Sequence, residues 1–197
     1  MTSSLDKAAQ EVGELVLAHS TNCSERIELL VAARMPQPGW QIDESKFKQL
    51  VTEFTALFLY VSDRLAFDLV GPKRRLKFGN GTLAVVNAIG TSLSLSKPHP
   101  APPFVSNVQA KITIVGVNTD LLNSRGAEYA RFTNFLKSDR FNHPNTLTWA
   151  FGVHVSDVFA EAALDPEIQG WSRMIAIESY AMFLPSVRRL LEEATSD

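Results

Sequence analysis

Two acidic residues stand at positions where the surrounding helical pattern is apolar. Asp63 lies within an apolar face of the stretch 54–70, and Glu178 lies in the apolar stripe of the last expected helix. A buried carboxylate without a partner is strongly destabilising, so each acid should be ion-paired, hydrogen-bonded or protonated. If the two acids face one another, they could share a proton or a cation. This hypothesis makes Asp63, Glu178 and the adjacent Arg64 candidates for a ligand-binding or catalytic site.

A simpler interpretation pairs each of these acids with an arginine from another helix, and the sequence favours it. Arg64, Arg131 and Arg173 are the candidate partners. Arg64 and Asp68 are spaced i, i+4, which also predicts a surface ion pair within the helix.

A second group of residues has the chemistry of a metal site. His154, Asp157 and Glu161 share one face of a helix expected over 144–163, and imidazole and carboxylates suit Zn, Fe or Mn. The apolar face of that helix lies roughly 100° away around its axis, which favours a solvated role for the three polar residues. The Glu-x-x-His signature of di-iron bundles is absent from the sequence. The metal hypothesis is therefore weak, and the sequence identifies no cofactor.

A basic stretch precedes the glycines of Gly79-Asn80-Gly81. Its four cations are Lys73, Arg74, Arg75 and Lys77. Such a turn could hold a phosphate on backbone N–H groups, and the letters that follow match G-x-G-x-x-A. The dinucleotide motif requires a preceding strand, however, and a helix is expected here. The favoured interpretation is a basic surface patch that contacts an acidic partner or is simply solvated.

Nucleophilic catalysis has no support in the sequence. There is no G-x-S-x-G motif, and His19, the histidine nearest to Cys23, stands four residues before it across an expected helix end. Whether the protein is an enzyme is left open.

These candidates must be positioned by helices, of which the stretch 43–70 is the most strongly specified. One apolar stripe runs along its whole length, and from residue 54 a second appears on the opposite side, with Ala56, Leu59, Tyr60, Phe67 and Val70. A helix that is apolar all round must be covered on all sides. Either this helix runs through the centre of the domain, or a second subunit covers its second face.

The remaining helices are predicted from periodicity and from start and stop signals. A capping box at 22–25 predicts a helix start, Gly71-Pro72 predicts a stop, and Asp165-Pro166-Glu167 is the clearest start in the chain. Pro185 is expected to kink or divide the last helix. The expected segments are 4–19, a helix that starts at the capping box of 22–25 and ends before Pro36, and then 73–95, 119–138, 144–163 and 166–194.

An irregular, proline-rich excursion is expected near 96–118. Four of the six residues from Pro98 to Pro103 are prolines, which suits a linker, a polyproline II arm or a partner-binding loop. Residues 109–117 have the β-branched alternation of a short strand, but a helical turn is an equally open alternative.

Composition limits the class of protein. The chain has 197 residues, 45% of them hydrophobic and 20% charged, which suits one helical domain over residues 1–197. The formal net charge of −2 argues against nucleic-acid binding by the whole domain. The single cysteine suits a reducing, cytoplasmic location. Glycines and polar residues interrupt the longest uncharged run, residues 78–96, so no membrane span is expected.

The sequence therefore predicts an all-α fold, a bundle of six or seven helices around a central buried helix at 43–70. The first functional hypothesis is protein–protein association, as a homodimer or an adaptor-like protein, because the central helix has a second apolar face. The alternative is a small-molecule-binding or metal-binding helical enzyme with a pocket that contains the buried acids.

Overall fold

The computed structural model describes residues 3–35, 40–91, 117–132, 146–159 and 165–196, and within these ranges all regular structure is helical. This confirms the all-α prediction for the described residues, which form five helices packed as a bundle. The total of six or seven helices stays a prediction. The proline-rich excursion lies outside the described residues except for 117 and 118, and so does the segment 109–117 except for Val117.

The first helix, α1, spans Ser4–Arg34 without interruption. Ser3 caps it in a capping box with Asp6, so the predicted division near residue 22 is wrong. The buried hydroxyls of Ser20 and Ser24 each donate a hydrogen bond to the carbonyl four residues earlier, at 2.6 and 2.8 Å. Because these hydroxyls bond backward to the preceding turn, neither serine caps the start of a new helix.

The second helix, α2, spans Glu44–Thr91 and bends once, at Gly71. Gly71 has φ 76° and ψ 170°, a backbone conformation that essentially only glycine adopts. Pro72 follows at the first turn of the second half, where its missing N–H costs no helical hydrogen bond. The predicted stop at Gly71-Pro72 is therefore correct as a break in direction, and a further helical segment follows it as expected.

Two short helices follow, and both are shorter than predicted. α3 spans Thr119–Tyr129 and begins at the expected cap, Asn118, whose side chain accepts from the Leu121 N–H at 3.1 Å. It ends in a turn at residues 130 and 131, and residues 133–138 of the predicted helix lie outside the described residues. α5 spans Leu147–Asp157, with Thr146 as its N-cap; the predicted start at Pro144 lies outside the described residues.

The last helix, α6, spans Pro166–Thr195 and starts at the predicted signal. The Asp165 carboxylate accepts hydrogen bonds from the Glu167 and Ile168 N–H groups at 2.8 and 3.1 Å. Pro185 does not divide this helix, which continues for ten residues beyond it.

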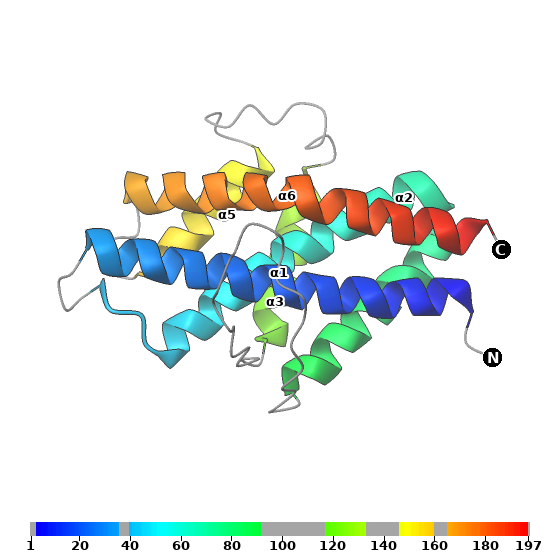
Figure 1. The fold of residues 1–197 in the computed structure, drawn as a ribbon, viewed down its shortest axis with the longest axis horizontal. Helices are drawn as coiled ribbons and strands as arrows, with labels where there is room; N and C mark the ends of the chain where they lie inside the picture. The colour runs from blue at the N-terminus through cyan, green and yellow to red at the C-terminus, as the bar shows by residue number, and fades with distance from the viewer. Residues whose placement is uncertain (1–2, 36–39, 92–116, 133–145, 160–164, 197) are drawn as a thin grey trace.

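The long helices α1 and α6 lie side by side and run in opposite directions across the front of the molecule (Figure 1). The Ser4 hydroxyl donates to the Ala194 carbonyl at 3.2 Å, and the Cys23 and Ser179 side chains meet at 3.0 Å. α2 packs against both helices, while α5 packs against α6 and α3 against α2. The beginning of α1 and the end of α6 therefore lie together at one end of this antiparallel pair (Figure 1).

The second half of α2 returns to the beginning of α1. A Cβ atom at Gly13 would lie only 2.8 Å from the Val85 side chain, so a glycine is required for the close approach of the two helices. The Lys77 ammonium also lies 2.9 Å from the Asp6 carboxylate. The bend at Gly71 is thus held in place by contacts beyond the turn itself.

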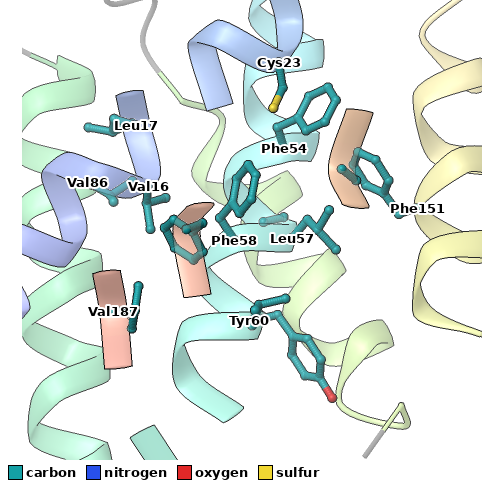
Figure 2. Packing of buried hydrophobic residues seen from close by; sticks show 14 of the residues in the cluster. Val16, Leu17, Cys23, Phe54, Leu57, Phe58, Tyr60, Val86, Phe151 and Val187 are labelled. Atoms are coloured by element: carbon teal, nitrogen blue, oxygen red, sulfur yellow. The ribbon is translucent and has the colours of Figure 1, made fainter. Parts of the chain in front are cut away.

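An aromatic core joins the first half of α2 to three other helices (Figure 2). The Phe54 ring meets Phe151 of α5 edge-on, with centroids 4.9 Å apart, and the Phe58 ring lies 4.7 Å from Phe183 of α6. His19 of α1 packs its ring against Phe58 and Phe183. Residues 50–58 of α2 are all buried, whereas both ends of the predicted range 43–70 include exposed residues, at 43–45, 48, 49, 67 and 68.

The second apolar face of α2 is covered largely by the same chain. Ala56 and Tyr60 are buried, and the Tyr60 hydroxyl donates to the Phe132 carbonyl just after α3 at 2.8 Å. Only the end of this face near the bend, at Phe67, is exposed. A second subunit is therefore not needed to cover this face, which removes the original reason for expecting a dimer.

Candidate functional site

The two acids singled out by the sequence are each held by an arginine, and not by the arginines first considered. Asp63 accepts two hydrogen bonds from Arg75, at 2.7 Å from Nε and 2.5 Å from Nη2. Glu178 accepts one hydrogen bond, at 2.5 Å, from Arg26. The two acids lie in separate ion pairs and do not share a partner among the described residues.

Arg64 does not form the predicted ion pair with Asp68. Its guanidinium instead lies over the Phe67 ring, 5.1 Å from the centroid, and the Arg75 guanidinium lies 5.5 Å from the same centroid. Arg64, Phe67 and Arg75 therefore form one cluster at the bend of α2.

The basic stretch is only partly free of acidic partners. Arg75 pairs with Asp63 and Lys77 with Asp6, and the Lys77 hydrogen bond is the main reason why the pKa of Asp6 lies below its usual value. Lys73 and Arg74 are exposed, and no described carboxylate lies within ion-pair distance of either. The stretch thus presents two neutralised and two free cations.

The three residues of the metal hypothesis do not meet as ligands in the described part of the chain. The His154 Nε2 atom lies 2.8 Å from a Glu128 carboxylate oxygen, and Nδ1 lies 3.8 Å from Asp157. Glu161 lies outside the described residues. Within those residues, no group of three or more histidine, cysteine, aspartate or glutamate side chains is placed to hold a metal ion.

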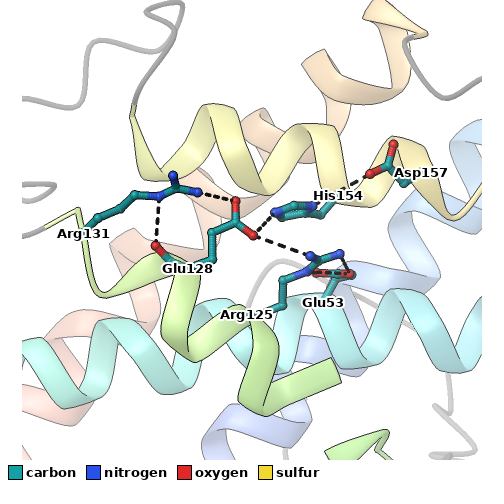
Figure 3. Close-up of polar contacts among 6 residues, drawn as sticks. All are labelled: Glu53, Arg125, Glu128, Arg131, His154 and Asp157. Carbon is teal, nitrogen blue, oxygen red and sulfur yellow. Dashed lines mark hydrogen bonds and ion pairs between the residues drawn. The ribbon is translucent and has the colours of Figure 1, made fainter. Parts of the chain in front are cut away.

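The most deeply buried charges belong to a cluster that the sequence did not reveal. Glu53 of α2 is 3% exposed and Arg125 of α3 is 16% exposed, and the Arg125 Nε and Nη2 atoms donate to the Glu53 carboxylate at distances between 2.7 and 3.0 Å. Glu128 and His154 extend the contacts to α5 (Figure 3). We call Glu53, Arg125, Glu128 and His154 the buried charge cluster.

Glu128 connects the members of the buried charge cluster. Its carboxylate lies 3.5 Å from the Arg125 Nη1 atom and accepts a hydrogen bond from Arg131 at 2.9 Å. Its contact with His154 is short, yet the imidazole is not oriented for a hydrogen bond, and neither ring nitrogen has a hydrogen-bond partner among the described residues. We therefore regard the His154–Glu128 contact as close packing of polar groups rather than a directed hydrogen bond.

Glu53 and Arg125 form a pair of opposite charges within the cluster. Burial by itself lowers the pKa of Arg125, but the hydrogen bonds and the charge of Glu53 outweigh it, so this pKa lies above its ordinary value. Tyr129, fully buried beside the cluster, has its pKa raised mainly by burial and further by the charge of Glu53. The contacts of the cluster join α2, α3 and α5. Its evident role is to hold the two short helices against the central one.

A signal for Glu53 was present in the sequence but was not used. Glu53 lies between Leu50 and Leu57, at i−3 and i+4, which is the same helical context that drew attention to Glu178. Arg125 and Glu128 had no comparable signal, because α3 is short and largely polar.

The single cysteine is buried, and His19 is half-buried. Burial raises the pKa of the Cys23 thiol to about 12, so the thiolate needed for nucleophilic chemistry is not formed at neutral pH. Burial also lowers the pKa of His19. Neither residue has the environment of a catalytic group.

Exposed apolar side chains mark two surfaces of the described structure. The first, here called the α1–α6 surface, consists of Leu29, Met174 and Met182 around the Arg26–Glu178 ion pair. The second, here called the bend surface, consists of Phe67 and Leu76 with the cations Arg64, Lys73 and Arg74. Contiguous exposed apolar groups are a feature of interaction surfaces.

The α1–α6 surface can be placed from helix geometry. Leu29 is one turn beyond Arg26, and Met174 and Met182 are one turn to either side of Glu178. Because α1 and α6 are antiparallel, Leu29 and Met174 lie on the same side of the ion pair, and Met182 lies on the other. The surface is apolar at both ends and has balanced charges at its centre.

No described helix is both long and apolar enough to span a membrane. Comparison of the chain with protein-family models, curated proteins and solved structures found no match.

Proposed function

We propose that this protein acts by association, and that its first partner is a second copy of itself, bound through the α1–α6 surface. The observation that supports this proposal is the exposure of Leu29, which at 69% is the most exposed large apolar side chain described. Met174 and Met182 flank the same ion pair and are also exposed. Methionine packs against varied partner surfaces because its side chain is unbranched and polarisable.

The charges of this surface suit self-association. A two-fold interface brings the same residues of both copies together. Arg26 and Glu178 contribute opposite charges at the centre of the surface, so two copies can face one another without a net repulsion. In such a dimer, Arg26 of each copy lies in the same contact surface as Glu178 of the other copy.

The proposed dimer predicts a specific pattern in sedimentation velocity. The unaltered protein should sediment as a dimer at high concentration, and Leu29→Lys should shift it to a monomer because it replaces an apolar side chain of the contact with a charge in both copies. Leu76→Lys, an equally exposed position on the bend surface, is the matched control and should leave the dimer intact. Circular dichroism checks that both variants fold. A protein that stays monomeric at all concentrations refutes the proposal, as does a dimer that Leu29→Lys does not weaken.

The alternative function, a helical enzyme with Asp63 and Glu178 in its pocket, has less support. Each acid is held by an arginine, which leaves neither as the unpartnered carboxylate that a general acid or a cation site would require.

A further inference from the structure

We infer that the bend surface binds an acidic segment of another protein, one that also carries an apolar side chain. The bend surface is separate from the proposed dimer contact. Lys77 contacts Asp6 near the start of α1, whereas Arg26 lies twenty residues further along that helix, a distance of about 30 Å at the helical rise per residue. The inference does not depend on the dimer.

The first step of the argument is the shape of the bend. Gly71 turns the chain, and the two hydrogen bonds between Arg75 and Asp63 connect the helical segments on either side of it. Residues 72–77 are thereby presented on a fixed turn, and all of them except Arg75 are exposed. A partner that binds here meets side chains whose backbone is already ordered, which lowers the entropic cost of association.

The second step is the local charge. Arg64, Lys73 and Arg74 have no described carboxylate within ion-pair distance, in contrast to Arg75 and Lys77. Asp68 is the remaining acid near the bend, and it is exposed. Arg75 and Asp63 neutralise one another and are left out of the count. The three cations Arg64, Lys73 and Arg74 and the acid Asp68 then give a local excess of two positive charges. The formal net charge of the whole chain is −2.

The third step is the apolar component. Leu76 is 67% exposed and Phe67 is 38% exposed, and the Phe67 ring is held beside the guanidinium groups of Arg64 and Arg75. An aromatic ring fixed among arginines is the type of residue that carries much of the binding energy at protein interfaces. Cations at the edge of an apolar contact select an acidic partner and accelerate the encounter with it.

These features favour an acidic protein segment as the partner of the bend surface, over a second copy of this chain or a nucleic acid. A second copy of this chain would bring the same positive excess to the contact and would be repelled. A nucleic acid requires a broader basic face, whereas the free cations here cluster at one bend and the total charge of the chain is negative. The exposed leucine and phenylalanine gain nothing from a phosphate backbone, but they can bury an apolar side chain of a peptide.

The test uses the full-length protein and a fluorescein-labelled peptide of repeated Glu-Glu-Leu, followed by fluorescence anisotropy. A Gln-Gln-Leu peptide of the same length and a single-stranded oligonucleotide serve as the comparison probes. We expect the acidic peptide to bind, with an affinity that falls as salt is added. Lys73→Glu/Arg74→Glu should weaken binding by about tenfold or more, because two attractive charges become repulsive. Leu76→Ser should weaken it by about threefold or more through lost apolar contact.

The matched control is Arg188→Glu/Arg189→Glu on α6. It changes the net charge by the same amount, at two exposed arginines that already have glutamate partners one turn away, and it should leave peptide binding unchanged. The inference is overturned if the acidic peptide does not bind, if the control weakens binding as much as the bend variant, or if the uncharged peptide binds equally well. Tighter binding of the oligonucleotide would also overturn it. The Leu29→Lys variant should still bind the acidic peptide, so this test does not depend on whether the protein forms the proposed dimer.

Discussion

The Glu53–Arg125 and Arg26–Glu178 ion pairs contain the same two residue types in opposite surroundings. Glu53 accepts three close hydrogen-bond contacts from Arg125 and is almost fully buried. Glu178 accepts one hydrogen bond from Arg26, and the side chains are 52% and 36% exposed. The first pair joins a short helix to the centre of the fold, whereas the second lies on an outer surface where water can replace either partner.

The difference shows that the effect of breaking an ion pair on stability depends on how deeply the pair is buried. Removing one partner of a buried pair leaves the other charge desolvated and unpaired, while an exposed charge is readily solvated. Asp63–Arg75 lies between these extremes, since its carboxylate is 28% exposed and accepts two hydrogen bonds. The three pairs therefore form a series from the most buried, Glu53–Arg125, to the most exposed, Arg26–Glu178.

The largest effect is expected from Glu53→Gln. This substitution removes the three close contacts of Arg125 with Glu53 and leaves Glu128, 3.5 Å from Arg125 Nη1, as the acidic neighbour. It should lower the free energy of unfolding by about 3 kcal/mol, the lower end of the range for breaking a buried pair. Urea denaturation followed by circular dichroism measures the change. A loss below about 1 kcal/mol would mean that Glu53 is solvated, contrary to the structure.

The double variant Glu53→Met/Arg125→Met tests whether Glu53 and Arg125 contribute to stability as a pair. Replacing both charges with apolar side chains of similar length avoids an unpaired buried charge. It should recover about 2 kcal/mol or more relative to Glu53→Met alone, measured in the same urea titration. If the two substitutions are instead additive, the stabilities of Glu53 and Arg125 are not coupled and the pair does not act as a unit.

A smaller effect is expected from Asp63→Asn at the bend of α2. Its two hydrogen bonds with Arg75 connect the helical segments on either side of Gly71, but both side chains have access to water. The free energy of unfolding should fall by about 1 kcal/mol, as measured by thermal and urea denaturation. A loss as large as that of Glu53→Gln would remove the graded relation between burial and stability.

The smallest effect is expected from Glu178→Gln. The exposed pair with Arg26 should contribute about 0.5 kcal/mol or less to stability, and this contribution should disappear in high salt. Urea denaturation at low and high salt measures it. A salt-insensitive loss above about 1 kcal/mol would show that the pair is shielded from water, contrary to its exposure.

Local signals in the sequence predicted several parts of this fold correctly. Asp165-Pro166-Glu167 starts α6 because a capping carboxylate and a proline act on N–H groups within one helical turn. Gly71-Pro72 bends α2 because the conformation of Gly71 is a property of that single residue. The division of α1 near residue 22 was wrong because a capping box also occurs inside helices, where the serines bond backward to the preceding turn.

The candidate site was less predictable than the helices. Periodicity correctly placed Asp63 and Glu178 next to apolar residues, but it could not distinguish the edge of a bundle from its interior. Glu53 has the same apolar neighbours one turn away as Glu178, yet only the structure shows that Arg125 covers it. A helical pattern shows which residues share a face, and it does not show what is packed against that face.

The sequence by itself determined the helical class, the central buried helix, its bend at Gly71 and the start of the last helix, because each of these depends on residues within a few turns of one another. The tertiary structure alone decided which acid meets which arginine. The partners are 12, 72 and 152 residues apart along the chain. The bend of α2 at Gly71 brings the first pair together, the packing of α3 against α2 the second, and the packing of α1 against α6 the third.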